Sequence, residues 1–201
     1  MALLTKEVSA GRRTAVPRRR LAWLLALALL GAVAPRVGAQ TETTLEYKVK
    51  AAFLFNFAQF VEWPARAFPT AESPQVIAVL GDDPFGAYLD ELVRGEKVSG
   101  HPLVVRRYKR VEDIAECHIL FISQSEAGAL DQILAALKGR AILTVGDIGT
   151  FARQGGMIQF VTEEGKIRLT HGINVDAARA CGLVISSTII RPETIFKPGK
   201  D

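Results

Sequence analysis

Apolar residues recur along residues 40–201 with two spacings, one typical of helices and one typical of strands. Residues 44–63 have helical spacing and stop at Pro64, which disfavours helical backbone in the residue before it. Short apolar runs predict strands, and helical patterns lie between them. The expected strands are 75–80, 103–108, 117–123 and 141–145, and the expected helices between them are 88–93 and 128–138.

The last third of the chain carries a hairpin signal and a final helix. Residues 157–162 and 166–170 flank the turn sequence Glu163-Glu164-Gly165. The final helix is expected to start at an Asn174 cap and to continue toward Ile190. Strands that alternate with helices need crossover connections. We therefore expect a single α/β domain whose mostly parallel sheet is flanked by helices on both faces, with one antiparallel hairpin.

The helix at 44–63 is apolar over more than half of its circumference. The apolar arc contains Tyr47, Val49, Ala51, Phe53, Leu54, Phe57, Ala58, Phe60 and Val61. Lys50 falls within this arc, where either its stem packs while its amine reaches water or a carboxylate, or it forms a buried ion pair or ligand contact. The opposite stripe carries Lys48, Asn56, Gln59 and Glu62 together with Phe55 and Trp63. Aromatic residues beside polar ones are typical of protein interfaces, although single exposed apolar residues are also normal.

Residues 81–86 (GDDPFG) follow a predicted strand and open a helix. Two adjacent acids would repel a phosphate, so we expect Asp82 or Asp83 to cap the helix, with Pro84 as its first residue. In open α/β sheets, ligands bind beyond the carboxyl ends of the strands. Asp82 and Asp83, together with Asp147 after the 141–145 strand, therefore form a candidate cleft for a small polar or cationic ligand.

The sequence offers little that could catalyse a reaction. The three histidines, at 101, 118 and 171, are not spaced as a metal-binding pair. Cys117 and His118 are neighbours on a predicted strand, so their side chains point to opposite faces and do not converge on one substrate atom. We expect no enzymatic activity, no catalytic residue, no cofactor and no bound metal.

The formal charge of +4 comes from the first 39 residues, which hold seven bases and one acid and leave 40–201 at a net −2. These 39 residues have the three parts of a secretory signal peptide: a basic segment, an apolar run of 14 residues at 21–34, and small residues before a cut after Ala39. The apolar run is shorter than the roughly 20 residues that span a bilayer. The sequence thus predicts a signal peptide at 1–39 and an exported domain at 40–201, with no nucleic-acid partner.

The exported domain contains two cysteines, Cys117 and Cys181. They allow one intramolecular disulfide, which loop-entropy models value at roughly 4 kcal/mol if the geometry permits it. Two buried thiols are equally compatible with the sequence, since it provides no distance between them.

Five segments in order resemble the signature blocks of the YfiR family of exported bacterial regulators. They are YKVKAAFLFNFAQFVEWP (47–64), VIAVLGDDPFG (76–86), CHILFIS (117–123), ILTVGDIGTFARQGGMIQFV (142–161) and INVDAARACGLVISSTII (173–190). The resemblance implies a periplasmic protein that binds the periplasmic sensing domain of an inner-membrane diguanylate cyclase and represses it, lowering cyclic-di-GMP and biofilm formation. It also implies an outer-membrane lipoprotein that sequesters the repressor, and a homodimer.

The disulfides of the founding repressor do not carry over, because Ala78 stands where a partner for Cys117 is expected and Cys181 replaces a frequent alanine. Arg191-Pro192 also interrupts a closing helix that is generally longer in the family. We expect partner contacts from the first helix and from the hairpin, at Phe55, Gln59, Glu62, Trp63, Glu163, Glu164, Lys166 and Arg168. The alternative function is a periplasmic small-ligand-binding module that serves a transporter or a sensor kinase.

Overall fold

A computed structural model describes residues 37–163, 166–168, 172–190 and 194–195. The chain divides into two compact units, Met1–Gln40 and Thr41–Asp201, and the features below belong to the second, apart from the first four residues of a helix that begins at Val37. The predicted signal peptide lies almost entirely outside the described residues, so cleavage after Ala39 stays a prediction.

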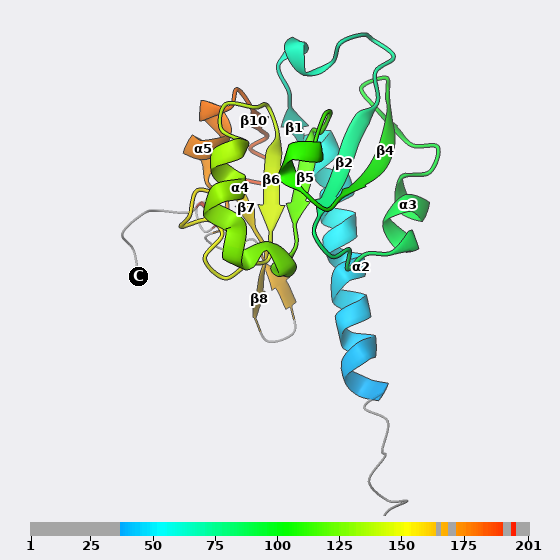
Figure 1. The fold of residues 1–201 in the computed structure, drawn as a ribbon. Coiled ribbons are helices and arrows are strands. Elements are labelled where there is room, and N and C mark those ends of the chain that lie inside the picture. The colour runs from blue at the N-terminus through cyan, green and yellow to red at the C-terminus, as the bar shows by residue number, and fades with distance from the viewer. Residues whose placement is uncertain (1–36, 164–165, 169–171, 191–193, 196–201) are drawn as a thin grey trace, which may run out of the picture. The chain divides into compact units, whose positions relative to one another are not determined.

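The described residues form a central sheet of six strands, five of them parallel (Figure 1). This confirms the predicted α/β class with a mostly parallel sheet. The spatial order is β3 (Lys97–Val98), β4 (His101–Tyr108), β2 (Gln75–Leu80), β5 (Ile119–Ile122), β6 (Leu143–Gly146) and β7 (Ile158–Gln159), and β3 is the antiparallel edge.

Alternate residues of the central strands supply two separate cores, because successive side chains of a strand point to opposite faces. In β2, every residue is buried; Ile77 and Val79 face one core, whereas Val76, Ala78 and Leu80 face the other. The register places Ile77 opposite Ile119 and Ile119 opposite Leu143, which stacks apolar side chains across the sheet.

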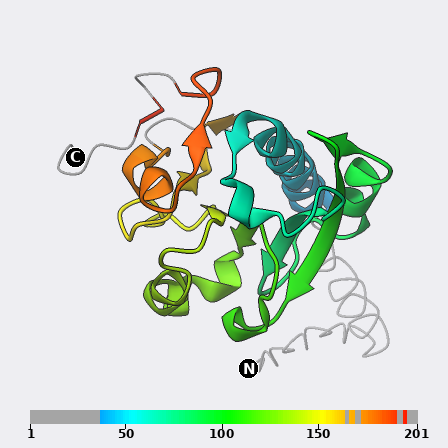
Figure 2. The ribbon, with the colours of Figure 1, turned by 90° about the horizontal axis from the view of Figure 1, so that it is seen from above.

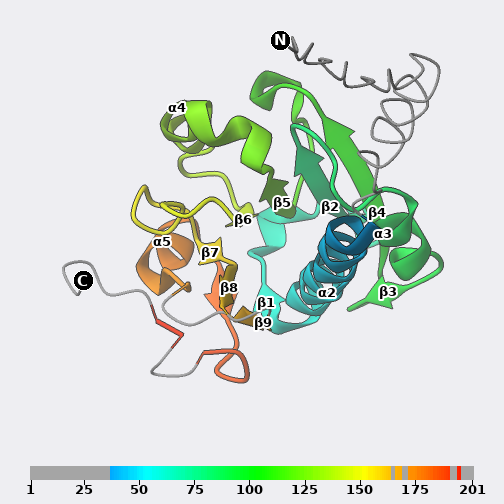
Figure 3. The ribbon, with the colours of Figure 1, turned by 90° about the horizontal axis from the view of Figure 1, so that it is seen from below.

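Helices cover both faces of the sheet, as predicted. Figures 2 and 3 show α2 (Val37–Phe60) and α4 (Leu130–Ala136) on opposite sides of the strands. The α2 core also receives residues of α3 (Ala87–Val93) and α5 (Val175–Ala180). The short helices η1 (Ala65–Ala67), η2 (Val111–Asp113) and η3 (Gln124–Ala129) lie in the connections.

Two predicted helices end earlier than expected, although α2 begins at Val37, before the predicted start at residue 44. α2 ends at Phe60, and the next residues form β1 (Val61–Glu62), which pairs antiparallel with β10 (Val184–Ile185). The Asn174 cap is confirmed, since its Oδ1 accepts from the Ala177 N–H at 3.0 Å, but α5 ends at Ala180. The predicted continuation to Ile190 is wrong because Gly182 adopts a φ of 79° and its N–H turns back to the Arg179 carbonyl.

The hairpin is confirmed as β8 (Val161–Glu163) paired with β9 (Lys166–Arg168). The expected single strand at 157–162 is divided, because Ile158–Gln159 joins the central sheet as β7. The predicted cap of α3 is also wrong: Gly86 occupies the cap position, and the Asp83 Oδ1 accepts from the Phe85 N–H at 2.8 Å in a local turn before the helix.

Candidate interaction site

The strand order reverses direction between β2 and β5, which makes their carboxyl ends the place where this class of sheet holds ligands. In this chain, Ser125 lies at the carboxyl ends of β2 and β5, where its Oγ accepts from the Asp82 N–H at 3.0 Å. A Cβ on Gly81, whose φ is 91°, would lie 2.3 Å from the same Oγ. The backbone after β2 is therefore closed against the segment that follows β5.

Asp82 and Asp83 are bound by bases of the 101–109 segment. Asp83 pairs with Arg107 at 2.6 Å and Asp82 with Lys109 at 3.0 Å. Arg107 also binds Asp90 at 2.5 Å, and this hydrogen bond holds the pKa of Asp90 below its usual value. The Lys109–Asp82 pair is solvent-exposed and the two Arg107 pairs are partly exposed, so solvent screening limits the contribution of each to stability.

Asp147, which follows β6, forms a buried ion pair with Lys50 of α2. Lys50 is only 2% exposed, and its Nζ lies 2.6 Å from the Asp147 Oδ2 and 2.6 Å from the Glu46 Oε1. The Tyr47 hydroxyl donates to the same Oδ2 at 3.0 Å. Of the two interpretations of Lys50, the structure therefore supports the buried ion pair.

The surroundings of this ion pair shift two neighbouring pKa values. Burial, followed by the negative charge of Asp147, raises the pKa of Tyr47, which keeps its hydroxyl a donor. Burial acts to raise the pKa of Glu46, but hydrogen bonds from Lys50 and Thr162 outweigh it, and the net shift is downward. The Asp147 Oδ1 is buried without a hydrogen-bond partner among the described residues.

The three acids of the candidate ligand cleft are thus each bound to a base of this chain. A cation at Asp82, Asp83 or Asp147 would have to displace Lys109, Arg107 or Lys50. Within the described ranges, no group of three or more His, Cys, Asp or Glu side chains could hold a metal ion.

An exposed ridge runs along α2 on the side away from the core. We call it the α2 ridge; it consists of Leu45, Lys48, Val49, Asn56 and Gln59, which fall within an arc of about 100° at helical spacing. Lys48, Asn56 and Gln59 are exposed as predicted. Val49 was expected in the buried arc but is 41% exposed, and Leu45 is 64% exposed. Leu45 and Val49 are four residues apart, so the sequence places them on the same face of the helix. Their apolar character alone does not tell whether the rest of the domain covers that face.

The aromatic residues of the predicted interface are more enclosed than expected. Phe55 is half-buried against the α2 core. Trp63 lies beyond the end of α2, and its Nε1 donates to the His118 carbonyl at 3.2 Å. Glu62 is exposed on β1, opposite Val184, which is 59% exposed. The hairpin side chains at 163–168 lie outside the described side chains, so their role stays a prediction.

His118 is a structural residue in a neutral form. Its Nδ1 accepts from the Val76 N–H at 3.0 Å, and its Nε2 lies 3.1 Å from the Ala67 carbonyl, to which it donates. The Phe68 ring stacks on it with 4.4 Å between centroids. Burial lowers the pKa of His118, in agreement with an imidazole that bonds through one acceptor and one donor nitrogen.

Cys117 and Cys181 are free thiols on opposite faces of the sheet. Cys117 belongs to the core beside α4, where burial raises its pKa to about 12. Cys181 is half-buried and packs against the α2 core. The disulfide that the sequence allowed is not formed.

The domain belongs to the class of open, doubly wound α/β proteins, with each of the three candidate cleft acids paired to a base of the chain and one helix presenting an exposed ridge. The family model described as YfiR/HmsC-like matches residues 47–191, and the chain belongs to this family. The sequence matches none of the curated proteins with which it was compared. In the part of the chain that the structure describes, no helix is both long and apolar enough to cross a membrane.

Proposed function

We propose that this protein is an exported regulator that binds the periplasmic sensing domain of an inner-membrane diguanylate cyclase and represses it. The observation that carries the proposal is the family match, which extends over residues 47–191 and so covers most of the compact unit Thr41–Asp201. A repressor of this kind binds the inactive state of the cyclase more tightly than the active state. Moving the cyclase from 99% active to 99% inactive requires about 5.5 kcal/mol of such preference.

We place the contact with the cyclase on the α2 ridge and the adjoining Glu62. Leu45 and Val49 expose apolar surface beside the charged Lys48, a combination that suits a protein interface. The helix beneath the ridge packs on the core through Leu54 and Phe57, both fully buried. A preorganised surface loses less entropy when it binds.

The proposal is tested by deleting the gene and measuring cellular cyclic-di-GMP. Deletion should raise cyclic-di-GMP, and the wild-type gene should restore it. A Leu45→Glu/Val49→Glu variant, which places charge on the exposed apolar half of the ridge, should be exported and folded but should fail to restore repression. Ala135→Glu is the matched control, since Ala135 is exposed on α4 across the sheet. No rise after deletion would refute the proposed function, and full repression by the ridge variant would refute the surface.

Capture from membranes identifies the partner directly. The wild-type protein should retain a diguanylate cyclase, and the ridge variant should lose it. An outer-membrane lipoprotein that sequesters the regulator, and a homodimer, belong to the same proposal; each would appear in the captured material or in the measured mass of the purified protein. Retention of a transporter instead of a cyclase would favour a small-ligand-binding module.

A further inference from the structure

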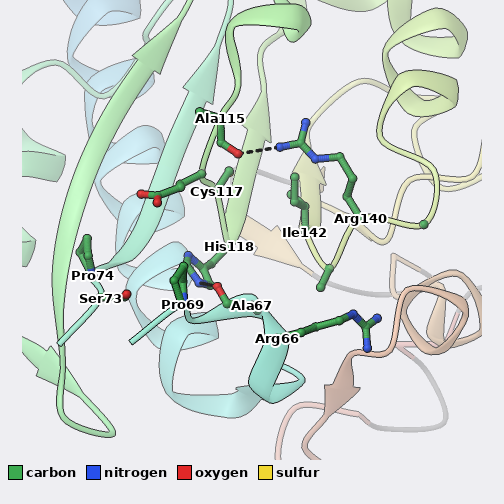
Figure 4. Close-up of a pocket in the computed structure, with 13 residues that line it drawn as sticks. Arg66, Ala67, Pro69, Ser73, Pro74, Ala115, Cys117, His118, Arg140 and Ile142 are labelled. Atoms are coloured by element: carbon green, nitrogen blue, oxygen red, sulfur yellow. Dashed lines mark hydrogen bonds between the residues drawn. The ribbon is translucent and has the colours of Figure 1, made fainter. Parts of the chain in front are cut away.

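A pocket of about 340 Å³ opens at the amino ends of the parallel strands, opposite the edge that holds Asp82 and Asp147. Figure 4 shows Arg140 and Ile142 on one wall and Pro69, Ser73 and Pro74 on the other, with Cys117 and His118 between them. The volume lies at the lower end of the range for small-molecule sites.

The charged side chains of the pocket favour an anion. Two guanidinium groups, Arg66 and Arg140, line it together with one carboxylate, Glu116. Glu116 is paired with Arg106, which is not part of the lining, at 3.5 Å. One positive charge in excess therefore acts within a concave, partly apolar surface, where electrostatic fields are concentrated.

The two arginines differ in whether their guanidinium groups have hydrogen-bond partners. The Arg140 Nη2 donates to the carbonyls of Ile114 and Ala115 at 2.8 and 3.0 Å, which fixes the direction of its guanidinium. Figure 4 shows the bond to Ala115. Arg66 is exposed and has neither a hydrogen bond nor an ion pair with any described residue. Its guanidinium lies beside Gly182, where a Cβ would stand 3.1 Å from the Nη2, and it must turn from there toward a ligand in the pocket. Its donors are unpaired among the described residues, and a guanidinium matches a carboxylate through two parallel hydrogen bonds.

The remaining lining contributes a fixed, uncharged surface. Both nitrogens of His118 bond to the backbone, and Phe68 stacks on the ring. The Cys117 thiol is buried, and its Sγ donates to the Ile119 carbonyl at 3.2 Å. Ile142 and Pro69 add apolar area on the two walls. The lining can therefore accommodate a short carbon skeleton next to the Arg66 donors.

We propose that this pocket is a binding site for a small organic carboxylate, with Arg66 as the principal anion contact. The proposal does not depend on the cyclase, because the pocket is formed by this chain alone. It is also distinct from the α2 ridge, since none of the lining residues belongs to α2.

The test is isothermal titration calorimetry of the purified protein with succinate, citrate and inorganic phosphate at low ionic strength, and with succinamide as the uncharged analogue of succinate. Succinate or citrate should bind saturably with one site per chain, and added salt should weaken the binding. Arg66→Gln should weaken it at least about tenfold, because hydrogen bonds between charged groups are lost. Arg110→Gln, an exposed arginine outside the pocket, is the matched control and should bind normally.

Three results would overturn the proposal or its ligand class. One is the absence of saturable binding for both carboxylates. Another is binding that Arg66→Gln leaves unchanged or that succinamide reproduces. Preference for phosphate over both carboxylates would overturn the ligand class. Arg140→Gln is not needed for the decision, because loss of its bonds to the backbone would also disturb the fold.

Discussion

The buried ion pair between Lys50 and Asp147 leads to the most direct prediction about stability. Lys50→Met replaces the ammonium with an apolar group of similar length and leaves Asp147, whose side chain is 7% exposed, without its charge partner. Removing one member of a buried ion pair costs about 3–5 kcal/mol, because the other charge remains desolvated. The Tyr47 hydroxyl still donates to the Oδ2, but the Oδ1 has no hydrogen-bond partner among the described residues.

Removing the charge of Asp147 should lower the free energy of unfolding by less than removing the charge of Lys50. In Asp147→Asn, Lys50 keeps its contact with Glu46 at 2.6 Å, so the buried ammonium remains paired. We expect a loss of about 1–3 kcal/mol, the cost of weakening a charged hydrogen bond. The double variant Lys50→Met/Asp147→Asn leaves neither Lys50 nor Asp147 as a buried unpaired charge. Its loss of unfolding free energy should therefore be smaller than the sum of the two single losses, by about 1–3 kcal/mol.

Urea unfolding followed by far-UV circular dichroism measures the free energy of unfolding of the two single variants and the double variant. Lys48→Met is the control for loss of a lysine on the exposed side of the same helix. The Lys48 ammonium lies 5.3 Å from the centroid of the Tyr88 ring, so the control should change the free energy of unfolding by no more than about 1 kcal/mol. The reasoning is refuted if Lys50→Met costs no more than the control, or if the two single effects add without coupling.

Three further predictions concern other parts of the domain. Gly156→Ala places a Cβ 2.2 Å from the buried ring of Phe151 and should lower the free energy of unfolding by about 1–3 kcal/mol. Gly149→Ala is the control, because its Cβ would meet open space, and it should not lower the free energy of unfolding. Equal effects of the two substitutions in urea unfolding would contradict this prediction. Burial lowers the pKa of His118, so the imidazole takes up a proton more readily in the unfolded chain than in the native state. The free energy of unfolding should therefore fall as the pH drops below 6.5. His118→Gln should remove most of this pH dependence in unfolding measurements, and an unchanged slope would show that other groups cause it. Cys181, which is half-buried, should react with a thiol reagent before Cys117, which is buried and has a pKa of about 12; a native protein without reactive thiols would point to a disulfide.

Much of the fold could be predicted because its signals are local. The apolar run at 75–80 and the one at 117–123 are bounded by turn residues, and β2 and β5 form there with every residue buried. The Asn174 cap is a signal carried by one side chain and the next turn, and it is confirmed. The period of apolar residues therefore determined β2, β4, β5 and β6, the helices between them and the two-sided burial of the sheet, but not the short strands β1, β3 and β10.

The errors arise where a distant segment competes with a local preference. Residues 61–62 continue a helical pattern, but they pair with residues 184–185, more than a hundred positions away. The same pairing, together with the turn at Gly182, ends α5 after Ala180. Spacing also placed Val49 in the buried arc, although its side chain is 41% exposed among the described residues.

The sequence alone determined the class of fold, the family and the presence of a lysine in an apolar arc. Only the tertiary structure decided that Asp147 pairs with this lysine, that Ser125 closes the crevice after β2, and that Arg66 and Arg140 line one pocket. The physical reason is the range of the interactions: periodicity and caps act within a few residues, whereas ion pairs and pockets join side chains that become neighbours only when the sheet assembles.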